Sequence, residues 1–255
     1  MKNFPFEGSV PKSIDKPNSL KSEHLKEDVK PILVCAGKPD NFKDSLLSDE
    51  KILKLENPSK TMHVDFSLKS VPDLIKRGYG KSGEVSSYVI SEINNFDKIS
   101  KGFVNCTGVI IAGKDKETGE DISILSHQYP KYFLSDEIKK KKFLDDLNEK
   151  IYEIKERSER NSIDAVIFGG NYIKDKEDHK KNYLNSISLL SKEISTILGF
   201  EPVVISGPKT GPAEEHIYYI NDDRKLYLFK TEVDNKSSEP FLPSDIKKQE
   251  EKWME

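Results

Sequence analysis

A cysteine and a histidine are the residues of this chain best suited to catalysis. Cys106 lies in the glycine-containing segment 102–108, and His127 ends the segment 122–127. An imidazole close to a thiol can accept its proton, and the thiolate that results is a strong nucleophile. The two residues therefore predict a cysteine-dependent enzyme, provided that the fold brings their side chains together.

The segments around these two residues predict a β-hairpin. The first segment runs into the apolar stretch 109–112, and three of the six residues at 122–127 are apolar. The loop 114–120 between them is polar and contains Gly119, which can adopt a left-handed backbone. The cysteine would then start the first strand and the histidine would lie near the end of the second. Folding of one hairpin would bring the two residues close.

The register of the hairpin decides whether they can meet. If Asp115 and Glu120 close a four-residue loop, Gly108 lies opposite His127. Cys106 and His127 are then diagonal neighbours on one face, about 7–8 Å apart between backbones, with the bare Gly108 between them. A slip of one residue would send them to opposite faces of the sheet.

A structural interpretation of the same residues stays open. A cysteine in a β-rich segment is often a small buried hydrophobic residue. A histidine is often a packed or a surface residue. The pair therefore needs support from the rest of the sequence.

The composition limits the kind of protein. A length of 255 residues fits one domain with extensions or two small domains. Hydrophobic residues make up 35% and charged residues 33%, so part of the chain is expected to lie outside any core. The net charge of −3 gives no general attraction to nucleic acid or to an anionic membrane.

Cysteine usage and the N-terminal sequence bear on location. Cys35 and Cys106 do not make a disulfide scaffold and suggest a reducing compartment. Residues 1–7 lack the apolar core of a secretory signal, and no apolar run reaches membrane-spanning length. We expect a soluble monomer in the cytoplasm, with signal-independent export as an effector left open. The histidines lack metal-ligand spacing, so no metal is expected.

Three regions are predicted along the chain. Residues 1–60 are rich in Lys, Ser and Pro and predict a mostly flexible extension, with a possible strand at 32–36 and a helix at 45–55. Residues 61–232 predict one α/β domain, and residues 233–255 a loose tail.

Within the domain, apolar periodicity predicts alternating helices and strands. Strands are expected at 64–68, 163–168 and 202–205, and a second hairpin at 216–229. Helices are expected near 83–96, from Ser135 to Ile154, and from Tyr183 to Ile197, where Gly199 stops the last one. The fold class is α/β, an α+β sandwich in which helices cover a mixed, largely antiparallel sheet.

The order of elements after Cys106 resembles the CheD-like chemoreceptor glutamine deamidases. Their relatives include the deamidating domain of cytotoxic necrotizing factor and other bacterial toxin deamidases. Segments 102–106, 125–127, 165–170 and 206–230 carry the resemblance, over roughly 130 residues. The sequence departs from the family in having Asn105 where a smaller residue is usual, a longer gap from cysteine to histidine, and a different N-terminal region.

The resemblance implies an activity and a role for each catalytic residue. A glutamine side chain of a protein substrate would be hydrolysed to glutamate, through a thioester on Cys106 and with His127 as the base. A threonine of the family, six positions before the cysteine, corresponds to Ser100, which would orient His127. No cofactor is required, and the partner is a protein with an accessible glutamine.

The resemblance also implies an environment for the substrate and the oxyanion. It is expected at positions beside the cysteine or at a strand end: Asn105, Thr107, Gly108, Gly169 and Gly170. The glycines would let the substrate backbone approach, and the backbone N–H of Cys106 would help to bind the oxyanion. An amine in place of water would give transglutamination from the same site.

Two alternatives remain from the residues themselves. One is a non-catalytic interaction module on the same scaffold, and the other is a different cysteine amidase or peptidase. An enzyme of either kind predicts that His127 depresses the pKa of Cys106 and leaves the pKa of Cys35 unchanged.

Overall fold

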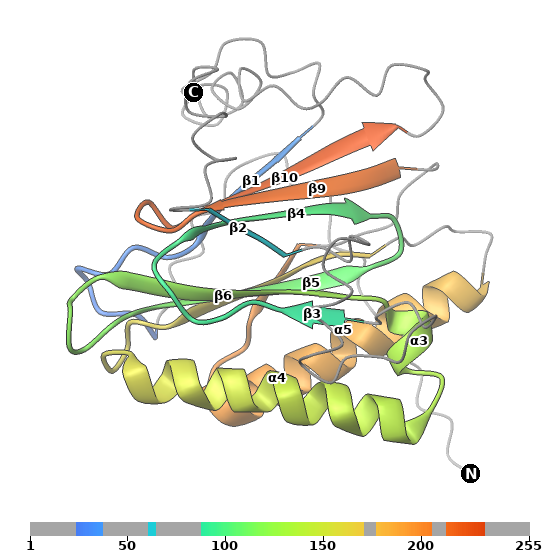
Figure 1. The fold of residues 1–255 in the computed structure, drawn as a ribbon, viewed down its shortest axis with the longest axis horizontal. Helices are drawn as coiled ribbons and strands as arrows, with labels where there is room; N and C mark the ends of the chain where they lie inside the picture. The colour runs from blue at the N-terminus through green and yellow to red at the C-terminus, as the bar shows by residue number, and fades with distance from the viewer. Residues whose placement is uncertain (1–23, 38–60, 65–87, 171–176, 206–212, 233–255) are drawn as a thin grey trace.

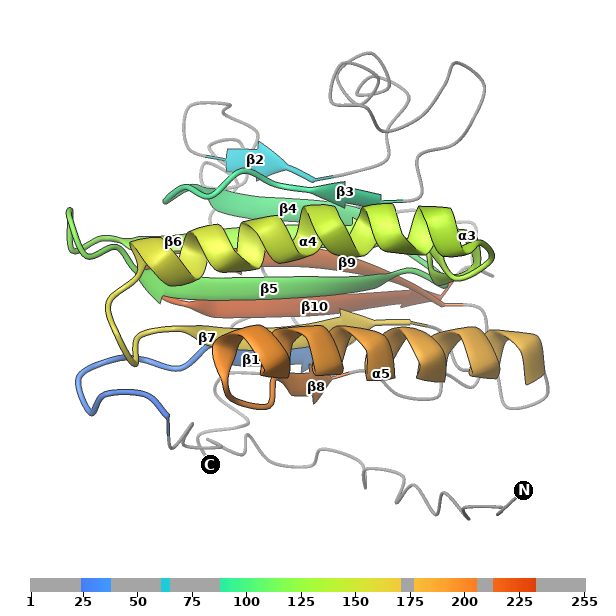
Figure 2. The ribbon, with the colours of Figure 1, turned by 90° about the horizontal axis from the view of Figure 1, so that it is seen from below.

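The computed structural model describes residues 24–37, 61–64, 88–170, 177–205 and 213–232. They form two five-stranded β-sheets that stack face to face, with helices on the outer face of one sheet (Figures 1 and 2). The predicted α/β class with mixed, largely antiparallel strands is confirmed. The strands are divided between two sheets rather than gathered in one.

The first sheet combines strands from both ends of the chain. Its order is β1-β10-β9-β4-β2. Its strands are β1 (Leu33–Gly37), β2 (Thr61–His63), β4 (Asp97–Phe103), β9 (Ala213–Ile220) and β10 (Lys225–Glu232). β1 runs parallel to β10 and β2 parallel to β4, whereas β9 is antiparallel to both of its neighbours.

The second sheet carries the predicted hairpin at its centre. Its order is β3-β6-β5-β7-β8. Its strands are β3 (Tyr88–Ile90), β5 (Thr107–Lys114), β6 (Asp121–Gln128), β7 (Asp164–Gly169) and β8 (Val203–Ile205). β7 and β8 run parallel and the other pairs antiparallel.

The register of the β5–β6 hairpin is the predicted one. The N–H of Asp115 donates to the carbonyl of Glu120 at 2.8 Å and closes the loop. Gly119 has φ +72°, the left-handed conformation that glycine favours. Gly108 consequently pairs with His127.

Helices cover the outer face of the second sheet. They are α3 (Pro130–Phe133), α4 (Glu137–Arg157) and α5 (Glu177–Leu198), and Figure 2 shows α4 and α5 side by side in front of the strands. The Asp136 side chain caps α4 by accepting hydrogen bonds from the backbone N–H groups of Ile138 and Lys139. Gly199, with φ +85°, follows the last turn of α5, as its place in the sequence predicted.

The second sheet is buried on both faces, which makes two apolar layers. Val109 and Ile111 of β5 pack toward the helices, whereas Ile110 and Ala112 pack toward the first sheet. A strand covered on both faces reads as a continuous apolar run, as 109–112 does. Successive side chains on β5 and β6 therefore point alternately into the helix layer and into the layer between the sheets.

The predicted helix near 83–96 is wrong for residues 88–96. Residues 88–90 form β3, which pairs with the end of β6. Tyr88, Val89 and Ile90 are β-prone residues, and pairing with a sheet edge outweighs the apolar spacing that suggested a helix. Residues 83–87, like the predicted helix at 45–55 and the tail 233–255, lie outside the described residues.

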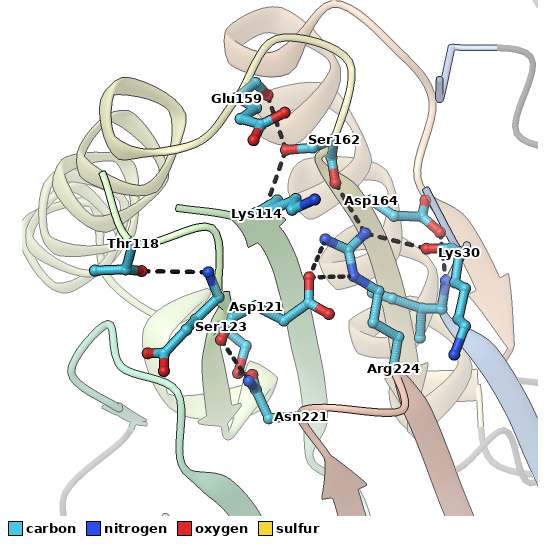
Figure 3. Close-up of polar contacts among 12 residues, drawn as sticks. Lys30, Lys114, Thr118, Asp121, Ser123, Glu159, Ser162, Asp164, Asn221 and Arg224 are labelled. Carbon is cyan, nitrogen blue, oxygen red and sulfur yellow. Dashed lines mark hydrogen bonds and ion pairs between the residues drawn. The ribbon is translucent and has the colours of Figure 1, made fainter. Parts of the chain in front are cut away.

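The predicted domain boundary at residue 61 is wrong for residues 24–37, which belong to the folded unit. Figure 3 shows the buried Arg224 guanidinium between Asp121, at 2.6 Å, and the carbonyls of Lys30 and Ser162, at 3.1 and 2.9 Å. β1 follows and extends the first sheet as an edge strand. The strand predicted as possible at 32–36 is thus present as β1, and partners that are remote in sequence hold the residues before it.

Candidate active site

The two predicted catalytic residues lie at one end of the sandwich. Cys106 lies between the end of β4 and the start of β5, and His127 lies near the end of β6, the right-hand end in Figure 1. Cys106 packs against the apolar cluster between the two sheets. His127 pairs with Val89, a member of that cluster, and therefore faces the same layer.

Ser100 makes the predicted contact with His127. Its Oγ lies 2.9 Å from the Nδ1 atom of His127 and also donates a hydrogen bond to the carbonyl of Val64. A hydroxyl has one hydrogen, and Ser100 donates it in the hydrogen bond to the Val64 carbonyl. The Nδ1–H of His127 is therefore the donor to Ser100, which leaves Nε2 as the ring nitrogen that can accept a proton.

The surroundings of His127 keep its ring neutral. The side chain is buried, and its ring stacks on that of Phe103 with centroids 3.7 Å apart and planes 14° apart. Burial lowers the pKa of His127 to about 3, and a hydrogen bond with the Val64 carbonyl raises this pKa by a smaller amount. The histidine is thus fixed in position and in tautomer without being charged.

The expected depression of the Cys106 pKa is not found. Burial raises the pKa of this thiol to about 12. The neutral His127 ring carries no charge that would stabilise a thiolate, so desolvation decides the direction. Cys106 is a free, partly buried thiol, and the side chain of Cys35 lies outside the described side chains.

The three glycines of the predicted substrate environment are used by the protein itself. A Cβ on Gly108 would lie 2.2 Å from the Phe168 ring, so that ring fills the space over Gly108. A Cβ on Gly169, which has φ +81°, would lie 2.7 Å from the Cys106 carbonyl. The N–H of Gly170 donates to that carbonyl at 2.6 Å. Gly169 and Gly170 therefore hold the peptide of Cys106 in place, and Gly108 leaves room for the Phe168 ring.

Thr107 and Asn105 lie on the side of the second sheet that faces the helices. Thr107 is buried, with its Oγ1 2.9 Å from Ser186 Oγ, and it accepts a hydrogen bond from Gln128 at 3.2 Å. Contact of Thr107 with substrate is therefore not supported. Asn105 is half-buried and lines a pocket.

This pocket has a volume of about 380 Å³ and begins one residue before the cysteine. Asn105 and Tyr129 form its wall at the strand ends, and Pro130, Lys131 and Leu134 form a second wall. The third wall comes from α5 and consists of Asp178, Lys181, Asn182, Tyr183 and Asn185. Its charged lining residues are Lys131, Asp178 and Lys181. A hollow of this size can hold a few side chains of a bound polypeptide.

The sequence analysis missed Phe103 and Val64. Phe103 lies within the glycine-containing segment that marked the cysteine, and an aromatic residue three positions before Cys106 was the available signal. Val64 acts through its backbone carbonyl, which no side-chain pattern can reveal.

Within the described ranges, no three His, Cys, Asp or Glu side chains gather as metal ligands. No helix in the described part of the chain has both the length and the apolar character needed to cross a bilayer.

The resemblance to the CheD-like deamidases stays a prediction. No family model and no curated protein matches this chain. Segments 102–106 and 125–127 meet at one end of the sandwich, and segment 165–170 supplies the N–H that holds the Cys106 carbonyl. Residues 206–212 of the fourth segment lie outside the described residues.

Proposed function

We propose that this protein is a cysteine-dependent hydrolase that converts glutamine side chains of proteins to glutamate. The oriented histidine carries the proposal. Ser100 Oγ accepts a hydrogen bond from Nδ1–H of His127 and donates one to the Val64 carbonyl. Nε2 of His127 is therefore the nitrogen that can act as the base. Cys106 packs in the same layer between the sheets, and its sulfur would be the nucleophile.

The catalytic step starts from two neutral groups. As the sulfur of Cys106 attacks the carboxamide carbon, its proton passes to His127, and the developing negative charge favours the imidazolium. An imidazolium whose resting pKa is about 3 is a strong acid, suited to protonating a poor leaving group such as an amide nitrogen. Ammonia leaves and a thioester remains.

The second half of the cycle uses the same groups. Nε2 of His127 takes a proton from water, the hydroxide oxygen bonds to the thioester carbon, and the carbon–sulfur bond breaks as the proton returns to Cys106. The tetrahedral oxyanion of each half needs backbone donors beside the sulfur, of which the N–H of Cys106 is nearest in sequence. An amine in place of water would give transglutamination.

The pocket beside Asn105 supports a polypeptide substrate. It lies next to the cysteine in sequence and is lined by polar and charged side chains from α3 and α5. Residues that flank the target glutamine would occupy it, while the glutamine side chain reaches the sulfur. We place the protein in a reducing compartment, the cytoplasm, as a monomer with its thiol free.

A non-catalytic interaction module is the second candidate. The raised pKa of Cys106 and the burial of His127 favour it, because both groups rest in their unreactive forms. An enzyme would react with a substrate-like electrophile, such as a peptide that bears a chloroketone in place of the glutamine amide. An idle thiol would react with it no faster than with chloroacetone.

Treatment of a cell lysate tests the proposed function. Wild-type protein should produce peptides in which a glutamine has become glutamate, read by mass spectrometry, without chain cleavage. The Cys106→Ser variant should produce none. Cleaved chains would indicate a peptidase, and identical peptide maps for the two proteins would contradict hydrolysis of either kind.

A further inference from the structure

The pocket beside Asn105 is lined by two lysines that the protein does not use for its own contacts. Lys131 lies in α3 and Lys181 in α5, so the two belong to different walls of the pocket. Among the residues that the structure describes, the ammonium group of neither lysine has an ion pair or a hydrogen bond. Both are therefore available to a ligand.

The lysines of α4 show the opposite pattern. Lys140, Lys141 and Lys142 each lie within 3.4 Å of a carboxylate on the same helix. Lys150 forms ion pairs with Glu92 and Glu153, both at 2.9 Å. Acidic side chains outnumber Lys and Arg in this protein, 44 to 41, so composition does not impose a lysine without a carboxylate beside it. Two such lysines on one pocket indicate a place for an anion from outside.

The carboxylate in the pocket lining has a structural role of its own. Asp178 lies in the first turn of α5, where a negative charge stabilises the N-terminal end of a helix. Lys181 follows three residues later, and in the described part of the chain no ion pair joins the two. The lining thus carries two cations and one anion in a protein whose net charge is −3. The local charge favours an acidic ligand.

The uncharged part of the lining fits a carboxylate that arrives on a polypeptide. Asn182 and Asn185 supply carboxamide groups from α5, and Tyr129 supplies a hydroxyl from the residue after β6. Amide N–H and hydroxyl groups can donate to a carboxylate, and amide oxygens can accept backbone N–H groups of a peptide. A volume of about 380 Å³ admits an acidic side chain together with part of its backbone.

The pocket lies at the end of the sandwich that holds the proposed nucleophile. α3 contacts α5, and Figure 2 shows α3 at the end of the molecule where α5 begins. Asn105 of the pocket immediately precedes Cys106 in the chain, and Tyr129 comes two residues after His127. A polypeptide whose glutamine reaches the sulfur would place its neighbouring residues beside this pocket.

We infer that the protein selects glutamines that have acidic residues near them in sequence. A Glu or Asp side chain of the substrate enters the pocket, and its carboxylate lies between Lys131 and Lys181. Each ammonium donates to one carboxylate oxygen, which makes two charge-assisted hydrogen bonds from opposite walls. This inference rests on the proposed function and adds to it the class of sequence around the target glutamine.

Three peptides with a central glutamine test the inference. They carry Glu, Ser or Lys at alternating positions on both sides of the glutamine, so that the test does not depend on the spacing between pocket and sulfur. Ammonia release by the wild type should give a kcat/KM roughly 10-fold higher for the Glu peptide than for the Ser peptide, through a lower KM. The Lys peptide should be the poorest substrate. High salt should weaken the preference, because it screens these charges.

Matched variants assign the preference to the two lysines. Lys131→Gln combined with Lys181→Gln should remove the preference for the Glu peptide, and Lys131→Glu combined with Lys181→Glu should transfer it to the Lys peptide. Lys141→Gln removes the same charge from an exposed lysine of α4 and should keep the preference of the wild type. All three lysines are exposed, so their replacement should leave the fold intact.

Binding and turnover separate the two claims. Fluorescence anisotropy with Cys106→Ser measures binding of the same peptides, carrying a fluorescent label, without turnover. Tighter binding of the Glu peptide with no ammonia release by the wild type would overturn the proposed function and leave the acidic selectivity of the pocket standing. Equal kcat/KM for the Glu and Ser peptides, a preference for the Lys peptide, or a preference that the double Gln variant keeps would overturn the inference and leave the proposed function standing. Neither binding nor turnover of any peptide would overturn both.

Discussion

The two ends of the sandwich bury polar side chains in opposite ways. At the end shown in Figure 3, buried charges are fully matched: Arg224 binds Asp121 and two carbonyls. At the other end, burial keeps Cys106 and His127 uncharged. Matched charges tie distant segments together, whereas neutral groups held in position can exchange a proton when a substrate arrives. The first end joins distant segments and is called the cohesive end. The second, where we propose that the reaction occurs, is called the reactive end.

Lys98 is a further buried basic side chain whose hydrogen-bond donors all have acceptors in the protein. It is buried, and its Nζ lies within 3.0 Å of Asn94 Oδ1, the Phe96 carbonyl and Ser123 Oγ. An ammonium has three hydrogens, so these three acceptors satisfy it. Burial lowers the pKa of Lys98 to about 7, partly offset by the neighbouring Asp97. The Ser123 hydroxyl in turn donates a hydrogen bond to Asn221 Oδ1, with 2.7 Å between the oxygens.

Loss of the nucleophile or the base should have the largest effect. Cys106→Ser and His127→Gln should each lower turnover by roughly 10⁴-fold, because each removes a group on which both halves of the cycle depend. Ser100→Ala should cost less, since it acts through His127. Ammonia release from a glutamine peptide measures all three.

Thermal unfolding of each variant shows whether a loss of turnover reflects a loss of folded protein. Cys106→Ser should unfold at nearly the wild-type temperature, whereas His127→Ala would leave a cavity beneath Phe103 and is a poor probe. Full activity in Cys106→Ser would show that the reactive end has been assigned to the wrong residues.

Removal of the Arg224 guanidinium at the cohesive end should lower stability and leave the activity of the folded molecules unchanged. Arg224→Met removes a buried guanidinium and leaves the half-buried Asp121 and two carbonyls without this donor, which should lower the free energy of unfolding by about 2–3 kcal/mol. The fraction that remains folded should keep its specific activity. Urea unfolding followed by fluorescence measures the loss. A stability close to that of the wild type would contradict the contrast between the two ends.

Truncation from the N-terminus should affect stability in two steps. Deletion of residues 1–23 removes none of the described contacts and should leave the thermal transition unchanged. Deletion of residues 1–37 removes β1, the carbonyl of Lys30 and the N–H of Ile32, and should lower the transition by several degrees. Equal transitions for the two deletions would show that residues 24–37 do not stabilise the domain.

Acid should destabilise the protein through His127. Its folded pKa of about 3 lies below the ordinary value of 6.5, so the unfolded chain binds a proton that the folded chain does not. The contribution of His127 to stability is therefore complete above about pH 6.5 and is lost as the pH falls toward 3. His127→Gln lacks this dependence, and the difference between the two pH profiles isolates it. Parallel profiles would contradict a buried neutral ring.

Alkylation of Cys106 should be slow and should lack a plateau near neutral pH. Burial raises its pKa to about 12, so the thiolate fraction and the rate with iodoacetamide should keep rising through pH 9. The exposed cysteine of glutathione, followed in parallel, supplies the reference rate. A plateau for Cys106 below pH 7 would indicate an ion pair with His127 and would restore the activated thiol that the sequence suggested.

The sequence was a good guide where neighbouring residues decide the structure. The register of the hairpin was predicted for the case that Asp115 and Glu120 close the loop 114–120, and they do close it. Gly199 ended α5 for a similar local reason. The contact between Ser100 and His127 was predicted from the resemblance alone, since 27 positions and two different sheets separate the pair.

The sequence failed where the deciding partners are remote. Residues 88–90 form a strand because they pair with the edge of β6. Residues 24–37 are held because Arg224 donates a hydrogen bond to the Lys30 carbonyl and Asp164 accepts one from the N–H of Ile32. The pKa of Cys106 depends on burial by both sheets, which a cysteine–histidine spacing does not report.

The state of the His127 ring tests the central claim most directly. Nitrogen NMR of protein labelled with ¹⁵N-histidine reports the protonation of each ring nitrogen at pH 7. We predict a neutral His127 with the proton on Nδ1, and a shift of the Nδ1 signal in Ser100→Ala. A proton on Nε2, or a charged ring at pH 7, would contradict a histidine held ready to accept the proton of Cys106.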